Sequence, residues 1–459
     1  MGSSIDGLAS GLNTTSIISS LMAVEAQPQT QLKTKLVSDQ TMISTLQSLN
    51  SKLSSLKGLA SGDSALNAMN LFTATTSSPL LTATATTSAT AGSIDVTVTQ
   101  LAQSQVDVSA AITSWPTDGS GAPAHLTLVD STGKQTEITP GSTSLDDVVT
   151  AINAASGPAR AVKVPAGNGT YRLQLTAATS GSTGAFSVYQ GTAAQVSAGT
   201  ATDLMADPSA AVVKAAQDAK ATLYAGTSAA QTITSGTNTF TELLPGVSVT
   251  ASAATAGPVT VNIASDSTGI TKKAGDLVNA VNDVLGFVSI YSTVTQTTDA
   301  KGASAASGGI FTGNSSIRAV NDDVFAAMSM PVNGKSPSEY GINVTRDGNF
   351  TFDAAKLQSS LASDPSGTQA ALQTIASRVS DAANNATDPI SGSVTGLIKG
   401  QQSEVADLGS QISDWDQRLA TRRLTLQTTY NAMEVALGQL NAQQSWLTGQ
   451  IAGLSTSTK

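Results

Sequence analysis

The stretch of sequence that decides the fold is residues 405–447, which read VADLGSQISDWDQRLATRRLTLQTTYNAMEVALGQLNAQQSWL. Mostly apolar residues recur through it in alternating steps of three and four, which is the a/d spacing of a coiled-coil helix. No proline follows Pro389, so the sequence predicts one unbroken helix over about 392–454. We identify as candidate interface positions the apolar seam residues Leu408, Ile412, Trp415, Leu419, Leu426, Met433, Leu440 and Leu447.

A helix of this length needs a partner. About sixty residues extend roughly 90 Å, which is too long for a compact domain of ordinary size to enclose. Isolated helices are only marginally stable in water, so the seam must pack against a second helix. Arg422, Thr429 and Gln443 interrupt the seam, and we expect them to weaken each contact. The other end of the chain supplies a partner helix with the same spacing and the candidate interface residues Leu46, Leu49, Leu53 and Leu56.

The first residues predict a separate short helix. Asn13 or Thr14 is suited to cap its start, and Pro28 breaks it. We call the two ends of the chain, residues 1–40 and 415–459, the terminal legs. We expect them to be partly disordered in the free monomer, and resistance of these residues to proteolysis would contradict this. The candidate contact residues of the N-terminal leg are Ile5, Leu8, Leu12 and Leu21.

The middle of the chain changes from helical to alternating periodicity. Ile94, Val96 and Val98 alternate with polar residues, as in a strand with one buried face. Ser144 is suited to cap a helix through Ile152, and Leu244-Pro245-Gly246-Val247 predicts a turn between strands.

After residue 266 the helical period resumes, around a hairpin signal at Asp347-Gly348. Asp353 is expected to cap a helix that Asp364-Pro365 ends, and 301–309 to form a loop. The predicted fold class is therefore α+β and multidomain, with a terminal coiled-coil helical stalk and inserted β-rich head domains. The predicted segments are an N-terminal leg helix (1–41), a stalk helix (42–70), the first part of a proximal head domain (71–113), a distal β-rich head domain (114–214), the second part of the proximal head domain (215–265), stalk helices with a hairpin (266–414) and a C-terminal leg helix (415–459).

Composition excludes several classes of function. The chain has no cysteine, so disulfides and thiolate chemistry are excluded, and its single histidine, His125, is read as a strand-edge residue. A net charge of −9 without a basic cluster argues against nucleic-acid binding. No apolar run reaches the length of a membrane span, and the first residues lack the basic and apolar regions of a secretory signal. We expect no enzyme, no cofactor and no metal site.

Several segments together resemble the flagellar filament cap proteins, the hook-associated protein 2 family. Residues 5–12 (IDGLASGL) resemble the opening of that family, and residues 96–103 (VTVTQLAQ) its entry to the head. Residues 144–153 (SLDDVVTAIN) resemble a small module that the family shares with flagellins. Residues 418–447 resemble the closing helix of the family. The resemblance spans nearly the whole chain in order and spacing, although 114–214 is the least similar part.

The resemblance implies a structural protein that is exported unfolded and without a cleaved signal. Such proteins assemble into a homo-oligomeric ring at the distal filament tip, where their legs dock on the filament. The ring guides exported flagellin into place and prevents its loss to the medium. The implied partners are further copies of the chain, flagellin, hook–filament junction proteins and an export chaperone.

A second hypothesis comes from a different class. A secreted adhesin or carbohydrate-binding module on a helical stalk would show the same β-rich middle and helical ends. The two hypotheses are compatible, because the head of a cap could also bind a surface.

Overall fold

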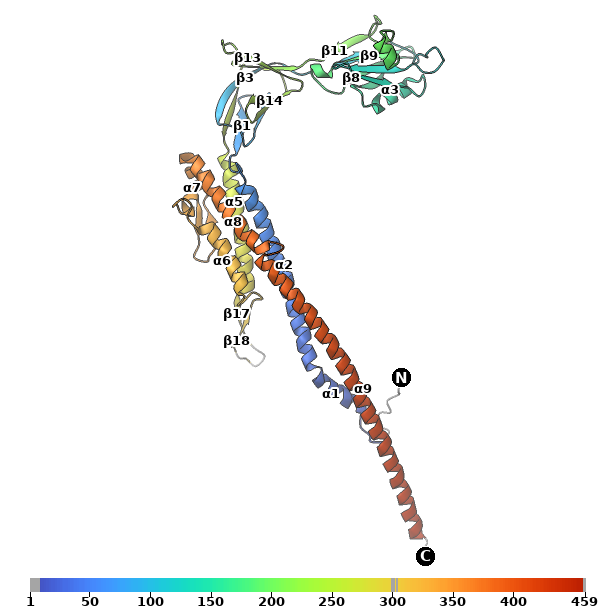
Figure 1. Ribbon diagram of the computed structural model, residues 1–459, viewed down its shortest axis with the longest axis vertical. Helices are drawn as coiled ribbons and strands as arrows, with labels where there is room; N and C mark the ends of the chain where they lie inside the picture. Colours follow the sequence, from blue (N-terminus) through green and yellow to red (C-terminus); the bar gives the residue numbers. More distant parts are fainter. Residues whose placement is uncertain (1–8, 299–301, 303, 457–459) are drawn as a thin grey trace. The chain divides into compact units, whose positions relative to one another are not determined.

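The computed structural model describes residues 9–298, 302 and 304–456, and the chain divides into two compact units (Figure 1). One unit is helical and combines both ends of the chain, up to Leu66 and from Thr271. The other unit, Asn67–Ile270, is rich in β-strands and is inserted between these two halves in the sequence. The predicted α+β multidomain class is confirmed.

The helical unit contains long helices and two short β-hairpins. The helix α5 begins at the boundary between the units and continues into this one. Its elements are α1 (Thr14–Glu25), α2 (Gln27–Ser64), α5 (Ser267–Ser292), β17 (Val294–Thr298), β18 (Ser304–Gly308), α6 (Ser315–Ser329), the 3₁₀ turn η2 (Pro337–Tyr340), β19 (Ile342–Val344), β20 (Phe350–Phe352), α7 (Ala354–Ser363), α8 (Pro365–Thr387) and α9 (Ser393–Thr456).

The leucine seam of α2 forms the core of this unit. α2 contacts both α8 and α9, and its apolar face lies against them. A partner molecule would therefore meet these leucines only if the bundle opened. Leu46, Leu49, Leu53 and Leu56 are each at most 1% exposed, and Leu408 of α9 is buried with them.

Replacing Leu53 with alanine should cost the helical unit about 2–5 kcal/mol of unfolding free energy, because the close-packed site leaves a cavity. Val37→Ala is the matched control, since Val37 lies on the same helix but is 61% exposed. Urea unfolding followed by the helical circular dichroism signal measures both. Equal losses in the two variants would contradict the assignment of the core.

One sequence prediction in this unit is confirmed but incomplete, and another is wrong. Asp364-Pro365 ends α7 as predicted, but Asp364 also caps α8 and Pro365 occupies its first turn. Asparagine, aspartate or serine followed by proline is a common way to start a helix, since proline needs no amide partner there. The segment 301–309 is not simply a loop, because Ser304–Gly308 pairs with Val294–Thr298 as a hairpin.

Other local predictions in this unit are confirmed. Asn13 caps α1 by accepting from the Ser16 amide, and Pro28 lies in the first turn of α2. The Asp347-Gly348 hairpin joins β19 to β20, and Asp353 caps α7.

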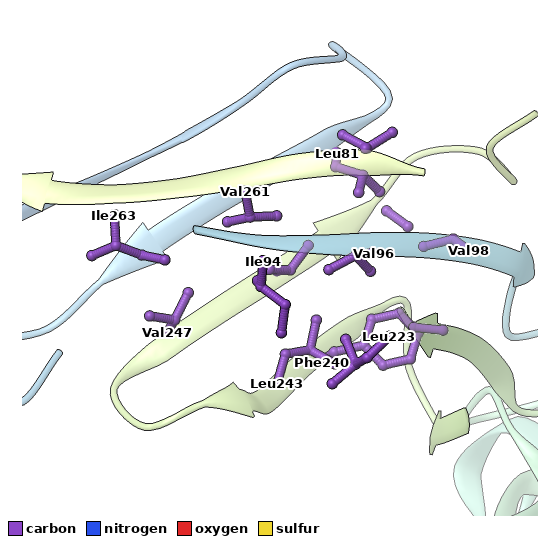
Figure 2. Close-up of a cluster of buried hydrophobic side chains, with 14 of the residues drawn as sticks. Leu81, Ile94, Val96, Val98, Leu223, Phe240, Leu243, Val247, Val261 and Ile263 are labelled. Atoms are coloured by element: carbon purple, nitrogen blue, oxygen red, sulfur yellow. The ribbon is translucent and has the colours of Figure 1, made fainter. Parts of the chain in front are cut away.

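The β-rich unit has two separate hydrophobic cores. The first contains a five-stranded sheet in the order β1-β16-β3-β12-β13 and a three-stranded sheet β14-β15-β2. Figure 2 shows apolar side chains of both sheets, including Val96, Phe240 and Val261, meeting in one cluster. The strands are β1 (Phe72–Thr76), β2 (Leu81–Ala85), β3 (Gly92–Gln100), β12 (Ala219–Leu223), β13 (Gln231–Ser235), β14 (Thr239–Leu244), β15 (Val247–Ala251) and β16 (Val259–Ser265).

The alternation of residues 94–98 is confirmed in β3. Ile94, Val96 and Val98 are buried, and Val96 pairs with Val259 on one side and Leu223 on the other. The predicted turn between β14 and β15 is also present. Gly246 adopts φ +71° there, and a Cβ would lie 2.7 Å from the Ala89 amide nitrogen, so only glycine fits.

The second core lies within residues 115–205 and is closed by two four-stranded sheets and the helix α3. Ser144 caps α3 as predicted, by accepting from the Asp146 amide. The Trp115 indole donates to the Ala124 carbonyl at 2.7 Å and anchors the Pro/Gly-rich loop between them. The elements are β4 (Val106–Val108), β5 (Leu126–Asp130), β6 (Gln135–Ile138), α3 (Leu145–Ala154), β7 (Ala159–Gly167), β8 (Thr170–Ala177), η1 (Ser182–Gly184), β9 (Phe186–Gln190), α4 (Ala193–Ser197), β10 (Thr202–Asp203) and β11 (Ala211–Lys214).

A buried carboxylate in this second core predicts a pH dependence. Asp107 is 1% exposed, and its Oδ1 has no hydrogen-bond partner among the described residues. Burial raises the pKa of the Asp107 carboxyl, the hydrogen bond from Gln105 opposes this, and the nearby Asp203 adds to it. The folded state therefore binds more protons than the unfolded chain, so the free energy of unfolding falls as pH rises above 3.8 toward the raised value.

Asp107→Asn should therefore make the protein more stable than wild type at pH 7, because asparagine carries no charge to bury. The gain should shrink as the pH falls below 3.8, where the wild-type carboxyl is protonated in both states. Scanning calorimetry at pH 3 and pH 7 measures the difference, with the exposed Asp381 changed to asparagine for comparison. A gain of equal size at both pH values would exclude the carboxyl charge as its cause.

Candidate functional site

The two ends of the chain run antiparallel along α9. Positions on α9 descend as positions on the N-terminal helices rise, so the contacts form an ordered ladder. Ser10 hydrogen-bonds Glu434, Glu25 pairs with Arg422 at 3.1 Å, and Lys35 pairs with Glu404. We call α1 together with residues 415–456 of α9 the leg.

A buried polar contact sets the register of this pairing. Gln29 is 6% exposed, and its Nε2 donates to Asp416 Oδ1 at 2.5 Å and to the Ile412 carbonyl at 3.4 Å. A polar residue in an otherwise apolar seam favours one register, because any shift leaves its hydrogen bonds unmade. Asp416 is therefore a contact residue of this pairing, although it is exposed on its other side.

Apart from the buried Leu408, the predicted seam residues of α9 fall into two groups. Ile412, Trp415, Leu419, Leu426 and Met433 are half-buried, whereas Leu440 and Leu447 are 59% and 54% exposed. The change occurs near the last described contact with the N-terminal segment, which joins Asn441 Nδ2 to the Ala9 carbonyl at 3.1 Å. The described part of the chain thus leaves the end of the seam uncovered.

The N-terminal helix packs on α9 through one face and leaves the predicted contact residues Leu12 and Leu21 exposed. Ile18 and Met22 are buried, and Met22 lines a shallow groove between α1 and α9 with Leu419. Leu12 and Leu21 are 48% and 44% exposed. The predicted leg residues Ile5 and Leu8 lie outside the described residues.

Sequence reasoning missed a second apolar stripe on α9. Leu424, Val435 and Trp446 are exposed and recur every eleven residues, which is about three turns and keeps them on one side of the helix. Val435 is two residues from Met433 and therefore about 200° round the helix, on the side opposite the seam. The eleven-residue spacing is present in the sequence, but the heptad pattern, which uses steps of three and four residues, does not include these three positions.

Metal-ligand clusters and membrane-spanning helices are both absent from the described part of the chain. No group of three or more candidate metal ligands occurs there, and none of its helices is both long and apolar enough to span a membrane. His125 lies one residue before β5 and contacts Glu137 at 2.9 Å, near the surface. The candidate functional site is the exposed surface of the leg.

Two family models match the chain in succession. Residues 10–105 match the flagellar hook-associated protein 2 N-terminus, and residues 216–442 match the flagellar hook-associated protein 2 C-terminus. Together they cover most of the helical unit and both ends of the β-rich unit, and they leave residues 106–215 unmatched. The chain belongs to the flagellar hook-associated protein 2 family. This family consists of structural proteins of the flagellum and not of enzymes.

Curated members of the hook-associated protein 2 family match over almost their full length. The flagellar hook-associated protein 2 of Escherichia coli O157:H7 is 26% identical over 475 residues, covering 98% of each chain. The A-type flagellar hook-associated protein 2 of Pseudomonas aeruginosa is 26% identical over 466 residues, covering 95% of each.

A solved structure shares the fold. The crystal structure of the D1-D2-D3 domains of the flagellar cap protein FliD from Escherichia coli covers 79% of this chain and 96% of its own, with a TM-score of 0.57 and 22% identity. The match supports the division of this hook-associated protein 2 family member into helical and β-rich parts.

Proposed function

We propose that this chain is the subunit of a cap at the distal tip of the flagellar filament. Membership of the hook-associated protein 2 family supports this, as does the likeness in fold to a protein described as a flagellar cap protein. The cap would be a homo-oligomeric ring outside the cell, reached by export of the unfolded chain.

The observation that carries the proposal is the concentration of exposed apolar side chains on the leg. Soluble monomers seldom expose contiguous apolar surface without a partner, because removing it from water stabilises a complex. Such side chains occur on α1, just before it, and on two sides of α9 between residues 424 and 451. They are Leu12, Leu21, Val24, Leu424, Val435, Leu440, Trp446, Leu447 and Ile451.

The leg surface suits helical partners. The heptad spacing of the seam continues through Leu440 and Leu447, beyond most of the described contacts between α9 and the N-terminal segment. A helix from another molecule can therefore extend the same packing. We propose that the leg docks on the growing filament through flagellin and on neighbouring copies in the ring. Hook–filament junction proteins and an export chaperone are further partners implied by this role.

The cap would act on flagellin without chemistry. Docked legs hold the ring at the tip, while exported flagellin folds and inserts beneath it and is kept from escaping into the medium. The polar interruptions Arg422, Thr429 and Gln443 weaken the seam, which would allow the legs to step as each subunit is added.

The test is the phenotype of a strain that lacks this gene. If the protein is a cap, the deletion strain should have hooks with short or absent filaments, and flagellin should accumulate in the medium. Normal filaments with lost attachment to surfaces would reject the cap and favour the secreted adhesin.

Deleting the last forty residues separates the same two alternatives in the protein itself. A cap should lose filament growth when this part of α9 is removed. An adhesin with a self-sufficient β-rich unit should still bind its surface, because residues 67–270 form their own cores.

A further inference from the structure

The two ends of the described chain meet at one buried carboxylate. Glu434 of α9 is 5% exposed, although it lies on a helix whose neighbouring residues are mostly exposed. Its Oε2 accepts from the Ala9 amide at 3.0 Å and from the Ser10 amide at 3.2 Å, and its Oε1 accepts from the Ser10 hydroxyl. One side chain thus receives three hydrogen bonds from residues more than 420 positions away.

The segment that Glu434 holds is a turn that leads directly into α1. Ser10 Oγ also accepts from the Leu12 amide at 3.1 Å, and Gly11 adopts φ +72°, which favours glycine. Asn13 then caps α1 by accepting from the Ser16 amide at 2.7 Å. The position of the turn therefore sets where α1 begins.

Three residues of α9 make a receiving face for this turn. Glu434, Gly438 and Asn441 follow one another at steps of four and three, so they lie on one side of the helix. Asn441 Nδ2 donates to the Ala9 carbonyl, and a Cβ built on Gly438 would make ordinary contact with Ala9 Cβ at 3.8 Å. The turn is thus held by its amides, its hydroxyl and its carbonyl.

We propose that Glu434 is a clasp that holds the N-terminal turn on α9 and thereby orders α1. A helix of 12 residues is marginal on its own, and α1 buries only Thr14, Ile18 and Met22. Hydrogen bonds to an ionised acceptor are stronger than neutral ones, and those to Glu434 are withdrawn from water. The clasp therefore supplies stability that the small apolar face of α1 lacks.

The clasp also makes the leg depend on both chain ends. Since Ala9, Ser10 and Glu434 come from opposite ends, the clasp can close only when both ends are free to meet. Under the proposed function, which this step assumes, a chain still partly inside an export channel would lack an ordered leg. Only the complete chain would then present the exposed residues of α1 and α9 as one docking surface.

Hydrogen exchange of the full-length protein tests the clasp directly. In Glu434→Ala, amides of residues 14–25 should exchange about ten- to a hundredfold faster than in wild type, the change expected from losing a buried charged acceptor. Ser10→Ala removes one described hydrogen bond to Glu434, together with the bond from the Leu12 amide, and should give a smaller increase in the same residues. Amides of α2 between residues 45 and 60 should be unchanged, because their packing does not involve the clasp.

Glu404→Gln is the matched control, because Glu404 is also on α9 and pairs with an N-terminal residue, Lys35, but at the surface. It should leave the exchange of residues 14–25 as in wild type. Unchanged exchange in both Glu434→Ala and Ser10→Ala would overturn the clasp. If Glu434→Ala fails to fold, the result with Ser10→Ala decides.

Filament growth in a strain carrying Glu434→Ala separates the clasp from the proposed function. Faster exchange with normal filaments would keep the clasp and reject its role in docking. Unchanged exchange, together with flagellin loss in the deletion strain, would reject the clasp and keep the cap.

Discussion

Replacing Leu440 and Leu447 together by asparagine should prevent filament growth while leaving the purified protein about as stable as wild type. Both side chains are more than half exposed, so the folded chain loses little packing. In a docked leg each leucine would be removed from water, which contributes about 1.5–3 kcal/mol per side chain. Losing both would weaken docking by roughly 3–6 kcal/mol per subunit, or about two to four powers of ten in affinity.

The control is Gln439→Asn with Gln450→Asn, which places two asparagines on the same part of α9 at exposed polar positions. It costs the helix a similar small loss of propensity without removing apolar surface. Each pair of variants is expressed in the deletion strain, and filament length and flagellin in the medium are measured. The leucine variants should secrete flagellin without filaments, and the glutamine variants should restore growth.

Normal filaments from the Leu440 and Leu447 variants would show that the end of the seam is not the docking surface. The opposite stripe would then be tested in the same way, with Val435 and Trp446 changed to asparagine. If neither stripe affects growth, exposed apolar surface on the leg would no longer support the cap.

Signals that depend on a few neighbouring residues were predictable from the sequence. The cap at Ser144, the turn at Asp347-Gly348 and the break at Pro28 each follow from local backbone chemistry, and each is present. The long helix was equally predictable, because its pattern repeats over many turns and depends on no single residue.

The helix α8 was missed because its buried face is built from small residues. Ala371, Ala376 and Ala383 are buried on the same side as Leu372 and Val379, so the apolar period is hard to distinguish from an alanine-rich background. Asp364-Pro365 was interpreted as an end, although the same pair starts a helix equally well. Only the contact of α8 with the α2 seam shows that it completes the core.

The candidate site was predictable only in part. The sequence identified the seam, but the burial of each position depends on how far the N-terminal segment reaches along α9. That reach is set by Glu434, whose polar contacts to Ala9 and Ser10 have no periodic signature. Long-range hydrogen bonds of this kind are outside what a spacing pattern can indicate.

Lys273→Met should cost the helical unit roughly 3 kcal/mol of unfolding free energy. Lys273 Nζ lies 2.6 Å from Asp63 Oδ1, and the Asp63 side chain is only 3% exposed. Asp63 Oδ2 already has no hydrogen-bond partner among the described residues. Removing the lysine would therefore leave a charged carboxylate inside the bundle without a partner, which is the costly way to break a buried pair.

The neighbouring residue provides a matched control. Lys272 pairs with Asp276 at the same distance of 2.6 Å, but its side chain is 76% exposed. Lys272→Met should cost at most about 0.5 kcal/mol, because exposed pairs four residues apart on a helix contribute little. The two variants remove the same charge from adjacent positions of α5, so their difference isolates the effect of burial. Urea unfolding followed by the helical signal gives both values.

A double variant separates the cost of the stranded charge from the value of the pair. Asp63→Asn with Lys273→Met removes both charges, so it should recover much of the stability that Lys273→Met loses. Recovery means that the lysine is needed mainly because Asp63 is buried at the last turn of α2. A double variant as unstable as Lys273→Met would instead show that the aliphatic part of the lysine side chain packs against the bundle. Equal stability of the Lys272→Met and Lys273→Met proteins would show that the Lys273–Asp63 pair contributes nothing.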